Sequence, residues 1–308
     1  MEAVEDDAVL VVGESLIDVV HAPGREAVEH VGGSAANAAV ALARLGRPVW
    51  FASAFGADDR GRRIRSQLQA EGIRWASDPL SLDHTAVAVA RLDDAGHATY
   101  TFDIAWQLHP LRDDLPPPAV VQVSSLAPTL APGAEDVLAA VHRYRDRALV
   151  AYDVNVRPAI TGTGPEVVAA VEAMVALADV VKASDEDLAG LYADRDEAAA
   201  VAHLLSLGPA VVVVTRGGDG AQWRSASASV EVPAQVGPVV DTIGAGDTFG
   251  AAMLDALMAR GCAGPGARQA LEDLGADHVH EVLARAAHAA AVTVSRAGAN
   301  PPYRRELG

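Results

Sequence analysis

The stretch VVDTIGAGDTFGAAMLDAL, residues 239–257, joins a glycine-rich turn to an alanine-rich run with helical spacing. Gly244 and Gly246 let successive backbone N–H groups point into one concavity, and the following helix adds the positive end of its dipole. Such a cradle can hold a phosphate or a developing oxyanion without a lysine. Asp247, in the first helical turn, would then accept a proton from a hydroxyl that attacks the bound phosphate. The alternative is an ordinary turn in which Asp247 caps the helix.

A dinucleotide-binding loop is a third interpretation of this stretch. The GxGxxG pattern needs a different spacing from the GAGDTFG found here and belongs after the first strand, whereas this segment lies near the C-terminal end of the chain. The first expected strand runs into VVGESLID, residues 11–18, which offers a single glycine. We therefore discount a nicotinamide-dependent oxidoreductase.

The composition excludes several kinds of partner. The chain has 308 residues and a formal charge of −17 at pH 7, whereas nucleic acids and anionic membranes need clustered Lys and Arg. Lys182 is the only lysine and lies in no GxxxxGK[ST] motif, and Cys262 is the only cysteine, so no internal disulfide can form. No secretory signal or membrane-spanning apolar run of roughly 20 residues is present. The sequence predicts a soluble, cytoplasmic protein with no nucleic-acid or membrane partner.

Short β-branched runs alternate with alanine-rich helical stretches along most of the chain. Near-continuous apolar strands that alternate with helices indicate an α/β fold with a mainly parallel sheet covered on both faces, in three α/β/α layers. We expect Ser34 to cap the first helix at its N-terminus and Gly46 at its C-terminus. The expected strands are 8–13, 48–53, 119–125, 148–154, 179–184 and 210–217, and the expected helices are 34–45, 58–71, 133–146, 165–178, 196–207, 246–260 and 277–294.

Two segments interrupt this alternation. Residues 18–33 and 85–104 have the pattern of antiparallel hairpins, the second with a DDAGH turn at 93–97. Neither is long enough to bury a core of its own. We therefore expect a single domain over residues 1–308, in which these strands form a small β-sheet lid over a site.

A further candidate region is DVNVRP, residues 153–158, which ends an expected strand. In open α/β folds, ligands bind at the carboxyl edge of the sheet, where such a strand ends. Asp153, Asn155 and Arg157 are therefore candidate site residues.

The array of motifs resembles the ribokinase-like, PfkB-type carbohydrate kinase family, and within it the fructokinases. GGSAANAAVALARLG (32–46) matches the family's first signature and DTIGAGDTF (241–249) its second. The other landmarks appear in the expected order over nearly the whole chain. They are GESLID (13–18), SSLAP (124–128), DVNVRP, VKASDEDL (181–188), VVTRGGDGA (213–221) and SRAGANPP (295–302).

The resemblance implies roles at the reaction centre. Asp247 would be the catalytic base, and the amides of Gly244, Ala245 and Gly246 would stabilise the transferring phosphoryl group. These are the roles that the residues themselves indicate. The resemblance also implies that Asp18, Gly32, Gly33 and Asn37 recognise the sugar, whose hydroxyls need carboxylate and amide partners. Without the resemblance, Asn37 is an exposed helix residue and Asp18 a turn residue.

The resemblance further implies sites for ATP, Mg²⁺ and K⁺. The family's Asn-x-x-Glu pattern, which is linked to Mg²⁺, falls on Ser184 and Asp187, and this aspartate is one methylene shorter than the usual glutamate. Adenine contacts are expected near His288, since the matching position is Ala287. The expected ATP contacts are Ser184, Thr215, Arg216, Gly217, Gly218, Gly220 and His288. The expected ligands of the monovalent cation are Asp241, Ile243, Thr293, Arg296 and Gly298, with the last family position at Pro302.

The leading hypothesis from the sequence is an ATP-dependent kinase that phosphorylates a primary hydroxyl of a small sugar, with fructose first. Ribose, 2-keto-3-deoxygluconate and nucleosides are the alternatives within this chemistry, because a few pocket groups decide specificity. A non-catalytic sugar or nucleotide sensor is the alternative class, although a sensor has no need of a positioned base. The paired hairpins also suggest a homodimer in which the lids meet, as in related dimers.

Overall fold

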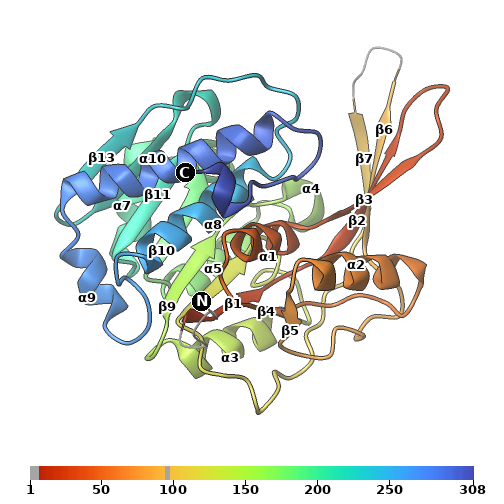
Figure 1. Cartoon of the computed structure of the whole chain (residues 1–308), viewed down its shortest axis with the longest axis horizontal. Helices are drawn as coiled ribbons and strands as arrows, with labels where there is room; N and C mark the ends of the chain where they lie inside the picture. The colour runs from red at the N-terminus through yellow and green to blue at the C-terminus, as the bar shows by residue number, and fades with distance from the viewer. Residues whose placement is uncertain (1–6, 94–97) are drawn as a thin grey trace.

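Valine-rich strands build the large sheet at the centre of this computed structural model, which describes residues 7–93 and 98–308 (Figure 1). The strands run in the order β13-β12-β11-β10-β9-β8-β1-β4-β5. All neighbours from β11 to β5 are parallel, and β12 and β13 extend the sheet with antiparallel pairs. The strands are β1 Val9–Val12, β4 Val49–Ala52, β5 Arg74–Trp75, β8 Val120–Ser124, β9 Leu149–Asp153, β10 Val180–Ser184, β11 Val211–Thr215, β12 Ala221–Ser225 and β13 Ser229–Val232.

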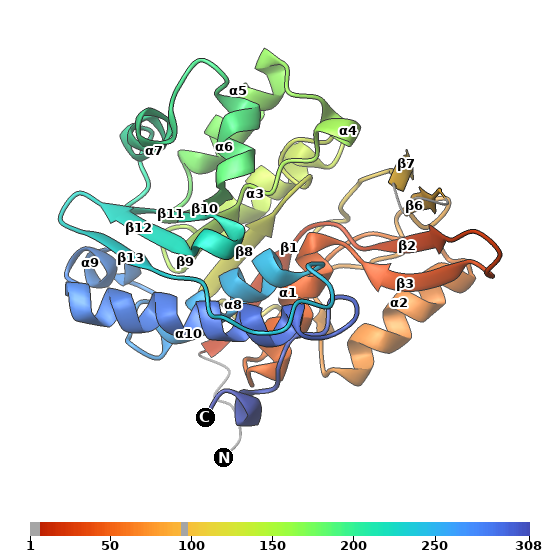
Figure 2. The same cartoon turned by 90° about the horizontal axis from the view of Figure 1, so that it is seen from above.

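Helices cover both faces of this sheet, as Figure 2 shows. Along β1, Val9 and Val11 face one apolar core, whereas Leu10 and Val12 face the other. The first core packs against α1 Ser34–Arg44, α2 Asp59–Ala70, α8 Ala245–Met258, α9 Ala267–Glu272 and α10 Ala276–Val294. The second packs against α3 Ala134–Tyr144, α5 Pro165–Val175, α6 Asp185–Leu191 and α7 Glu197–Ser206. Short helices lie at α4 Pro158–Thr161, η2 Gly217–Asp219 and η3 Arg304–Glu306.

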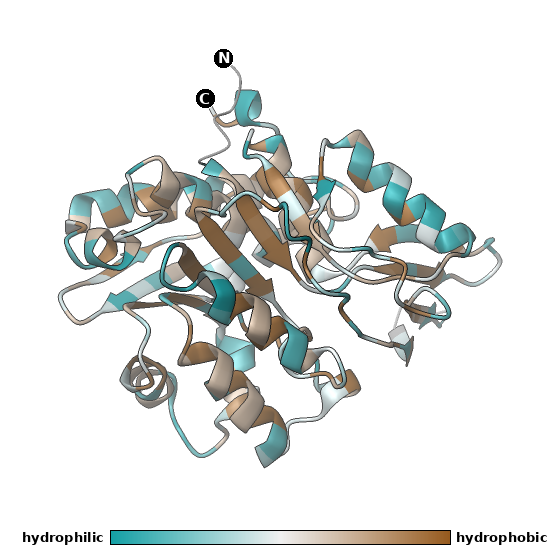
Figure 3. Cartoon of the chain, turned by 90° about the horizontal axis from the view of Figure 1, so that it is seen from below, coloured by the Kyte–Doolittle hydropathy of each residue, from teal (hydrophilic) through white to brown (hydrophobic). Residues whose placement is uncertain are grey.

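The predicted three-layer α/β fold is confirmed. Figure 3 shows the apolar strands of the large sheet enclosed by helices whose outer surfaces carry hydrophilic residues. Most of the buried residues of α1, which packs against α8, are alanines, and such small side chains let helices approach closely. Within the described residues, no helix is long and apolar enough to cross a membrane.

A four-stranded sheet of order β3-β2-β6-β7 extends away from the large sheet (Figure 1). The segments predicted as hairpins form its antiparallel pairs, β2 with β3 and β6 with β7, and a parallel pairing of β2 with β6 joins them. Residues 94–97 of the predicted DDAGH turn lie outside the described residues. The strands are β2 Leu16–His21, β3 Val28–Gly32, β6 Val87–Leu92 and β7 Ala98–Asp103.

The predicted caps of the first helix are wrong by one residue. Gly33, with φ of +101°, is the N-cap of α1, and Ser34 is the first helical residue. The Ser34 hydroxyl does not cap the helix because it donates a hydrogen bond to Asp247 instead. At the other end Leu45 is the C-cap, and Gly46 follows it with φ of +82°, a conformation that glycine adopts without strain.

Candidate active site

The candidate site lies at the carboxyl edge of the large sheet, where five parallel strands end. β1 leads into Glu14, β8 into Ser125, β9 ends at Asp153, β10 at Ser184 and β11 at Thr215. The strand order diverges at β1, whose neighbours are β4 on one side and β8 on the other. Ligands of open α/β sheets bind at such a switch point.

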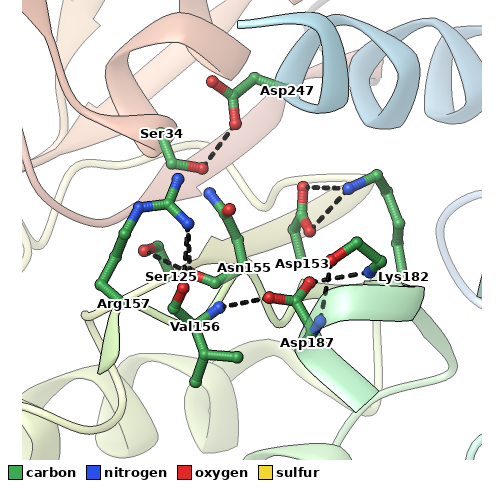
Figure 4. Close-up of polar contacts among 10 residues, drawn as sticks. Ser34, Ser125, Asp153, Asn155, Val156, Arg157, Lys182, Asp187 and Asp247 are labelled. Atoms are coloured by element: carbon green, nitrogen blue, oxygen red, sulfur yellow. Dashed lines mark hydrogen bonds and ion pairs between the residues drawn. The ribbon is translucent and has the colours of Figure 1, made fainter. Parts of the chain in front are cut away.

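Asp247 is held at this edge by two side chains of α1. Its Oδ1 accepts a hydrogen bond from the Ser34 hydroxyl at 2.7 Å, and its Oδ2 accepts one from Nδ2 of Asn37 at 2.8 Å. Figure 4 shows the Ser34 and Asp247 side chains pointing toward one another from different elements. The Asp247 residue is only 7% exposed and makes no capping hydrogen bond to its own helix. The interpretation of Asp247 as a simple cap is therefore wrong.

The glycine-rich turn before α8 leaves backbone amides free. Gly244, the N-cap, has φ of +74°, and a methyl group there would lie 2.6 Å from Cβ of Ala299. Among the described residues, the amides of Gly244, Gly246 and Asp247 donate to no protein acceptor, whereas the Ala245 amide donates to the Thr242 carbonyl at 3.3 Å. Three free amides at a helix N-terminus are donors suited to an anion.

Asp18 lies on β2, above the glycine pair. A methyl group on Gly32 would lie 2.0 Å from Oδ2 of Asp18, and one on Gly33 would lie 2.7 Å from the Glu14 carbonyl. Burial raises the pKa of Asp18 to about 6, against the opposing charges of His30 and Arg157. Gly32 therefore makes room for the Asp18 carboxyl group, and Gly33 lets the start of α1 lie close to the backbone that follows β1.

Asp153 forms a buried ion pair with the only lysine of the chain. Both carboxylate oxygens of Asp153 lie 2.9 Å from Nζ of Lys182 (Figure 4). Burial alone would lower the pKa of Lys182, but the charge and hydrogen bonds of Asp153, together with the charges of Asp187 and Asp247, outweigh burial and raise that pKa. A methyl group on Gly246 would lie 3.5 Å from the same Nζ, so the ammonium lies beside the free amides of α8.

Asp187 and Ser184 form a capping box at the start of α6. Asp187 Oδ2 accepts from the Ser184 amide at 2.7 Å, and Oδ1 accepts from the Val156 amide at 2.8 Å. The carboxylate therefore ties α6 to the segment that carries Asn155 and Arg157. Asn155 has φ of +37°, and its carbonyl accepts hydrogen bonds from the Ser125 hydroxyl and the Arg157 guanidinium.

The predicted nucleotide loop is the turn between β11 and β12. The Arg216 side chain binds residues near this turn: its guanidinium donates to the Glu197 carboxylate at 2.6 Å and to the Gln222 side chain at 2.9 Å. Within the described residues, no hydrogen bond joins residues 215–220 to the free amides of α8. His288 of α10 shares a hydrogen bond of 2.9 Å with the Gln235 side chain.

The segments predicted to hold a monovalent cation lie side by side. The Val240 amide donates to the Val294 carbonyl at 2.8 Å, and Asp241 Oδ2 accepts from the Gly298 amide at 2.8 Å. Asp241 Oδ1 also accepts from the Ile243 amide at 3.0 Å. The hydroxyl of Thr293 is turned inward, toward Thr248.

Sequence reasoning missed Glu14 as a site residue. This carboxyl group is buried, its Oε1 accepts from the Ser34 amide at 2.9 Å, and its Oε2 has no partner in the described part of the chain. Burial raises the pKa of Glu14 to about 7, against the opposing effects of backbone hydrogen bonds and Arg157. Its position just after β1 could have identified it, because ligands bind at the carboxyl ends of the strands in such folds and the same rule selected Asp153 at the end of β9.

The raised pKa of Glu14 predicts a pH-dependent stability. The folded protein holds this proton more tightly than the unfolded chain does. The contribution of Glu14 to the free energy of unfolding is therefore complete below about pH 4.5 and is lost as the pH rises through about 7. Between pH 5 and pH 8, the free energy of unfolding should fall by about 2–3 kcal/mol because of Glu14. Glu14→Gln cannot ionise and should lose correspondingly less, as urea unfolding at both pH values would measure. Equal pH dependence of the two proteins would contradict the assignment.

An α/β/α fold with a buried carboxylate beside free amides of a helix N-terminus has the parts of a phosphotransferase that acts on an alcohol group. Comparison with known proteins agrees. The model of the pfkB family of carbohydrate kinases matches residues 6–305. The chain belongs to this family, and its relatives include fructokinases.

Two curated relatives carry different names. The fructokinase of Salmonella typhimurium is 32% identical over 307 residues, which cover 97% of each chain. Aminoimidazole riboside kinase of Salmonella typhimurium strain LT2 is 31% identical over 265 residues, which cover 82% of each chain. The chain is therefore a sugar kinase with more than one kind of relative.

Solved structures give the same fold. The ATP-bound fructokinase of Xylella fastidiosa has a TM-score of 0.86 and 28% identity, with 97% of each chain covered. A double mutant of Vibrio cholerae fructokinase with bound fructose, ADP and potassium ion has a TM-score of 0.76 and 25% identity, with 95% of this chain and 94% of that one covered.

Proposed function

We propose that the chain transfers the γ-phosphoryl group of ATP to a primary hydroxyl of fructose. The observation that carries the proposal is the Asp247 carboxylate, buried beside the free amides that begin α8. The fructokinase relatives and the ATP-bound fructokinase structure support the choice of sugar and donor.

In the proposed reaction, Asp247 takes the proton of the sugar hydroxyl as its oxygen bonds to the γ-phosphorus and the bond to the β-phosphate oxygen breaks. The backbone amides of residues 244–247 stabilise the negative charge on the transferring group. Among these amides, that of Ala245 also donates to the Thr242 carbonyl. The Lys182 ammonium adds positive charge behind Gly246. Positioning and electrostatics therefore supply the catalysis.

Sugar recognition is assigned to groups on both sides of Asp247. Asp18 and Asn37 offer a carboxylate and an amide to the hydroxyls, Gly32 leaves room for the Asp18 carboxylate, and Gly33 lets the start of α1 lie close to the Glu14 backbone. Across the site, Asn155 and Arg157 add further polar groups (Figure 4). Asp153 acts mainly through Lys182, because both of its oxygens bind that ammonium.

ATP is assigned to the edge between β11 and α10. The phosphates would point toward the start of α8, and Thr215 to Gly220 would contact the nucleotide through their backbone together with Ser184. Val236, Val239 and Val240 form an exposed apolar segment next to the contact between Gln235 and His288. A planar, largely apolar adenine ring suits such a segment.

Mg²⁺ and K⁺ are proposed as the accompanying ions. Asp187 would contact Mg²⁺ through water, using lone pairs that its backbone hydrogen bonds leave free. Within the described residues, no group of three or more His, Cys, Asp or Glu could hold a metal, which suits an ion carried largely by ATP phosphates. K⁺ would take oxygen ligands from the adjoining segments, and the potassium-bound fructokinase supports this choice. The ligands are Asp241, Ile243, Thr293, Arg296 and Gly298, with the Pro302 carbonyl as a further candidate.

We propose that residues 1–308 form one domain with the four-stranded sheet as its lid. Val28 and Tyr100 are exposed on this sheet, and a second copy of the chain would cover such residues in a lid-to-lid homodimer. Sedimentation at micromolar concentration should show a dimer, and a monomer would contradict this part of the proposal.

A coupled ADP-release assay with ATP, Mg²⁺ and K⁺ tests the function against fructose, ribose, 2-keto-3-deoxygluconate and aminoimidazole riboside. Turnover of fructose above the others is expected. Preferential turnover of aminoimidazole riboside would select the second candidate, which the other Salmonella relative supports. Thermal stabilisation by a sugar without any ADP release would instead favour a sensor.

A further inference from the structure

Asp247 owes its position to contacts that lie outside its own helix. Its Oδ1 is bound by the Ser34 hydroxyl at 2.7 Å and its Oδ2 by the Asn37 amide at 2.8 Å, both from the first turn of α1. Because Gly33 is the N-cap, no side chain of the preceding residue fixes this turn. Some other group must hold the Ser34 hydroxyl in place.

Glu14 is that group. Its Oε1 accepts the Ser34 backbone N–H at 2.9 Å, and so satisfies one of the first amides of α1, which have no partner within the helix. Glu14 is 6% exposed, and its other oxygen has no partner among the described residues. Burying a carboxyl group with one oxygen unpartnered is costly. The Oε1 contact leads to Ser34, and the Ser34 hydroxyl leads to Asp247.

We propose that Ser34 and Glu14 are positioning residues for the Asp247 base, acting as a chain from the end of β1 through the start of α1 to the start of α8. This inference rests on the proposed function of Asp247. The Ser34 hydroxyl fixes the rotamer of the carboxylate by donating to its Oδ1. Glu14 acts through Ser34, because its Oε1 holds the backbone that carries that hydroxyl.

The first test follows the NMR signal of the Asp247 carboxyl carbon at constant pH, with the signal assigned by its loss in Asp247→Asn. Ser34→Ala removes the hydroxyl that donates to Oδ1 and should shift this signal, because the carboxylate loses a hydrogen bond. Ser206→Ala, at the end of α7, is the matched control and should leave the signal in place. An unchanged Asp247 signal in Ser34→Ala would overturn the proposal.

The second test separates kcat from KM. Ser34→Ala should lower kcat about 10-fold, as expected for one hydrogen bond to a charged group, with little change in KM for the sugar. Ser34→Thr keeps a hydroxyl and should recover part of the loss. Glu14→Ala should also lower kcat, and the double variant should lose no more than the larger single loss, because both act on one contact. Glu14→Gln keeps an acceptor for the Ser34 amide and should lose less than Glu14→Ala.

The two tests separate failure of the inference from failure of the proposed function. Additive losses of kcat in the double variant, or a normal kcat in Ser34→Ala, would contradict the positioning role of Ser34 and Glu14. The proposed kinase function would stand in either case. If the wild type turns over no sugar but the Asp247 carboxyl signal still shifts in Ser34→Ala, the contact is supported and the kinase function is rejected.

Discussion

Asp247→Asn is expected to lower kcat at least ~10²-fold while the protein still binds its sugar, the low end for loss of a general base. The substitution is isosteric. Its side-chain oxygen can still accept from Asn37 or Ser34, and the Ser34 hydroxyl can accept from the new amide, so the fold should persist. What is lost is the ability to take a proton from the attacking hydroxyl. The coupled ADP-release assay measures kcat, and calorimetry measures sugar binding.

Asp277→Asn is the matched control for this variant. Asp277 also lies in the first turn of a helix, α10, but it is exposed. Its replacement should leave kcat unchanged, which separates loss of the base from a general effect of removing a helix-terminal charge. Near-normal turnover by Asp247→Asn would remove Asp247 from the mechanism and with it the main support for the proposed function.

The sequence predicted the parallel sheet well because its signal is local. Four consecutive valines in β11 are fully buried on both faces, and alternation with helices then leaves few arrangements. The cap of α1 was predicted wrongly because Ser34 is a good N-cap in isolation. A residue more than 200 positions away, Asp247, competes for its hydroxyl, and no local pattern contains that information.

The candidate site was only partly predictable for the same reason. Motif spacing located the free amides of α8 and the Asp247 carboxylate. It could not show that Arg216 is committed to Glu197, or that both oxygens of Asp187 accept backbone amides. Those contacts join elements that are neighbours only in the folded sheet. Lys182 stood out in the sequence as the only lysine, but its partner Asp153 follows from the pairing of β9 with β10.

The ion pair of Lys182 and Asp153 predicts the second large effect. Lys182→Met should lower the free energy of unfolding by about 3–5 kcal/mol, because it leaves the Asp153 carboxylate buried without a counter-charge. Urea unfolding at pH 8 measures this loss, with the m-value checked for a change in cooperativity. A substitution that merely removed packing would cost less, since methionine preserves most of the lysine stem.

A double-mutant cycle distinguishes the loss of a charge partner from a loss of packing. Asp153→Asn keeps the size of the side chain and removes the charge that Lys182→Met would strand. If the unpaired carboxylate is the source of the loss, the double variant should be more stable than Lys182→Met alone, with a coupling energy of about 1–3 kcal/mol. If the two losses simply add, the pair contributes by packing only. In that case the role of the ammonium beside Gly246 would be its charge at the reaction centre. Lys182→Met should then lower kcat strongly and change the free energy of unfolding little.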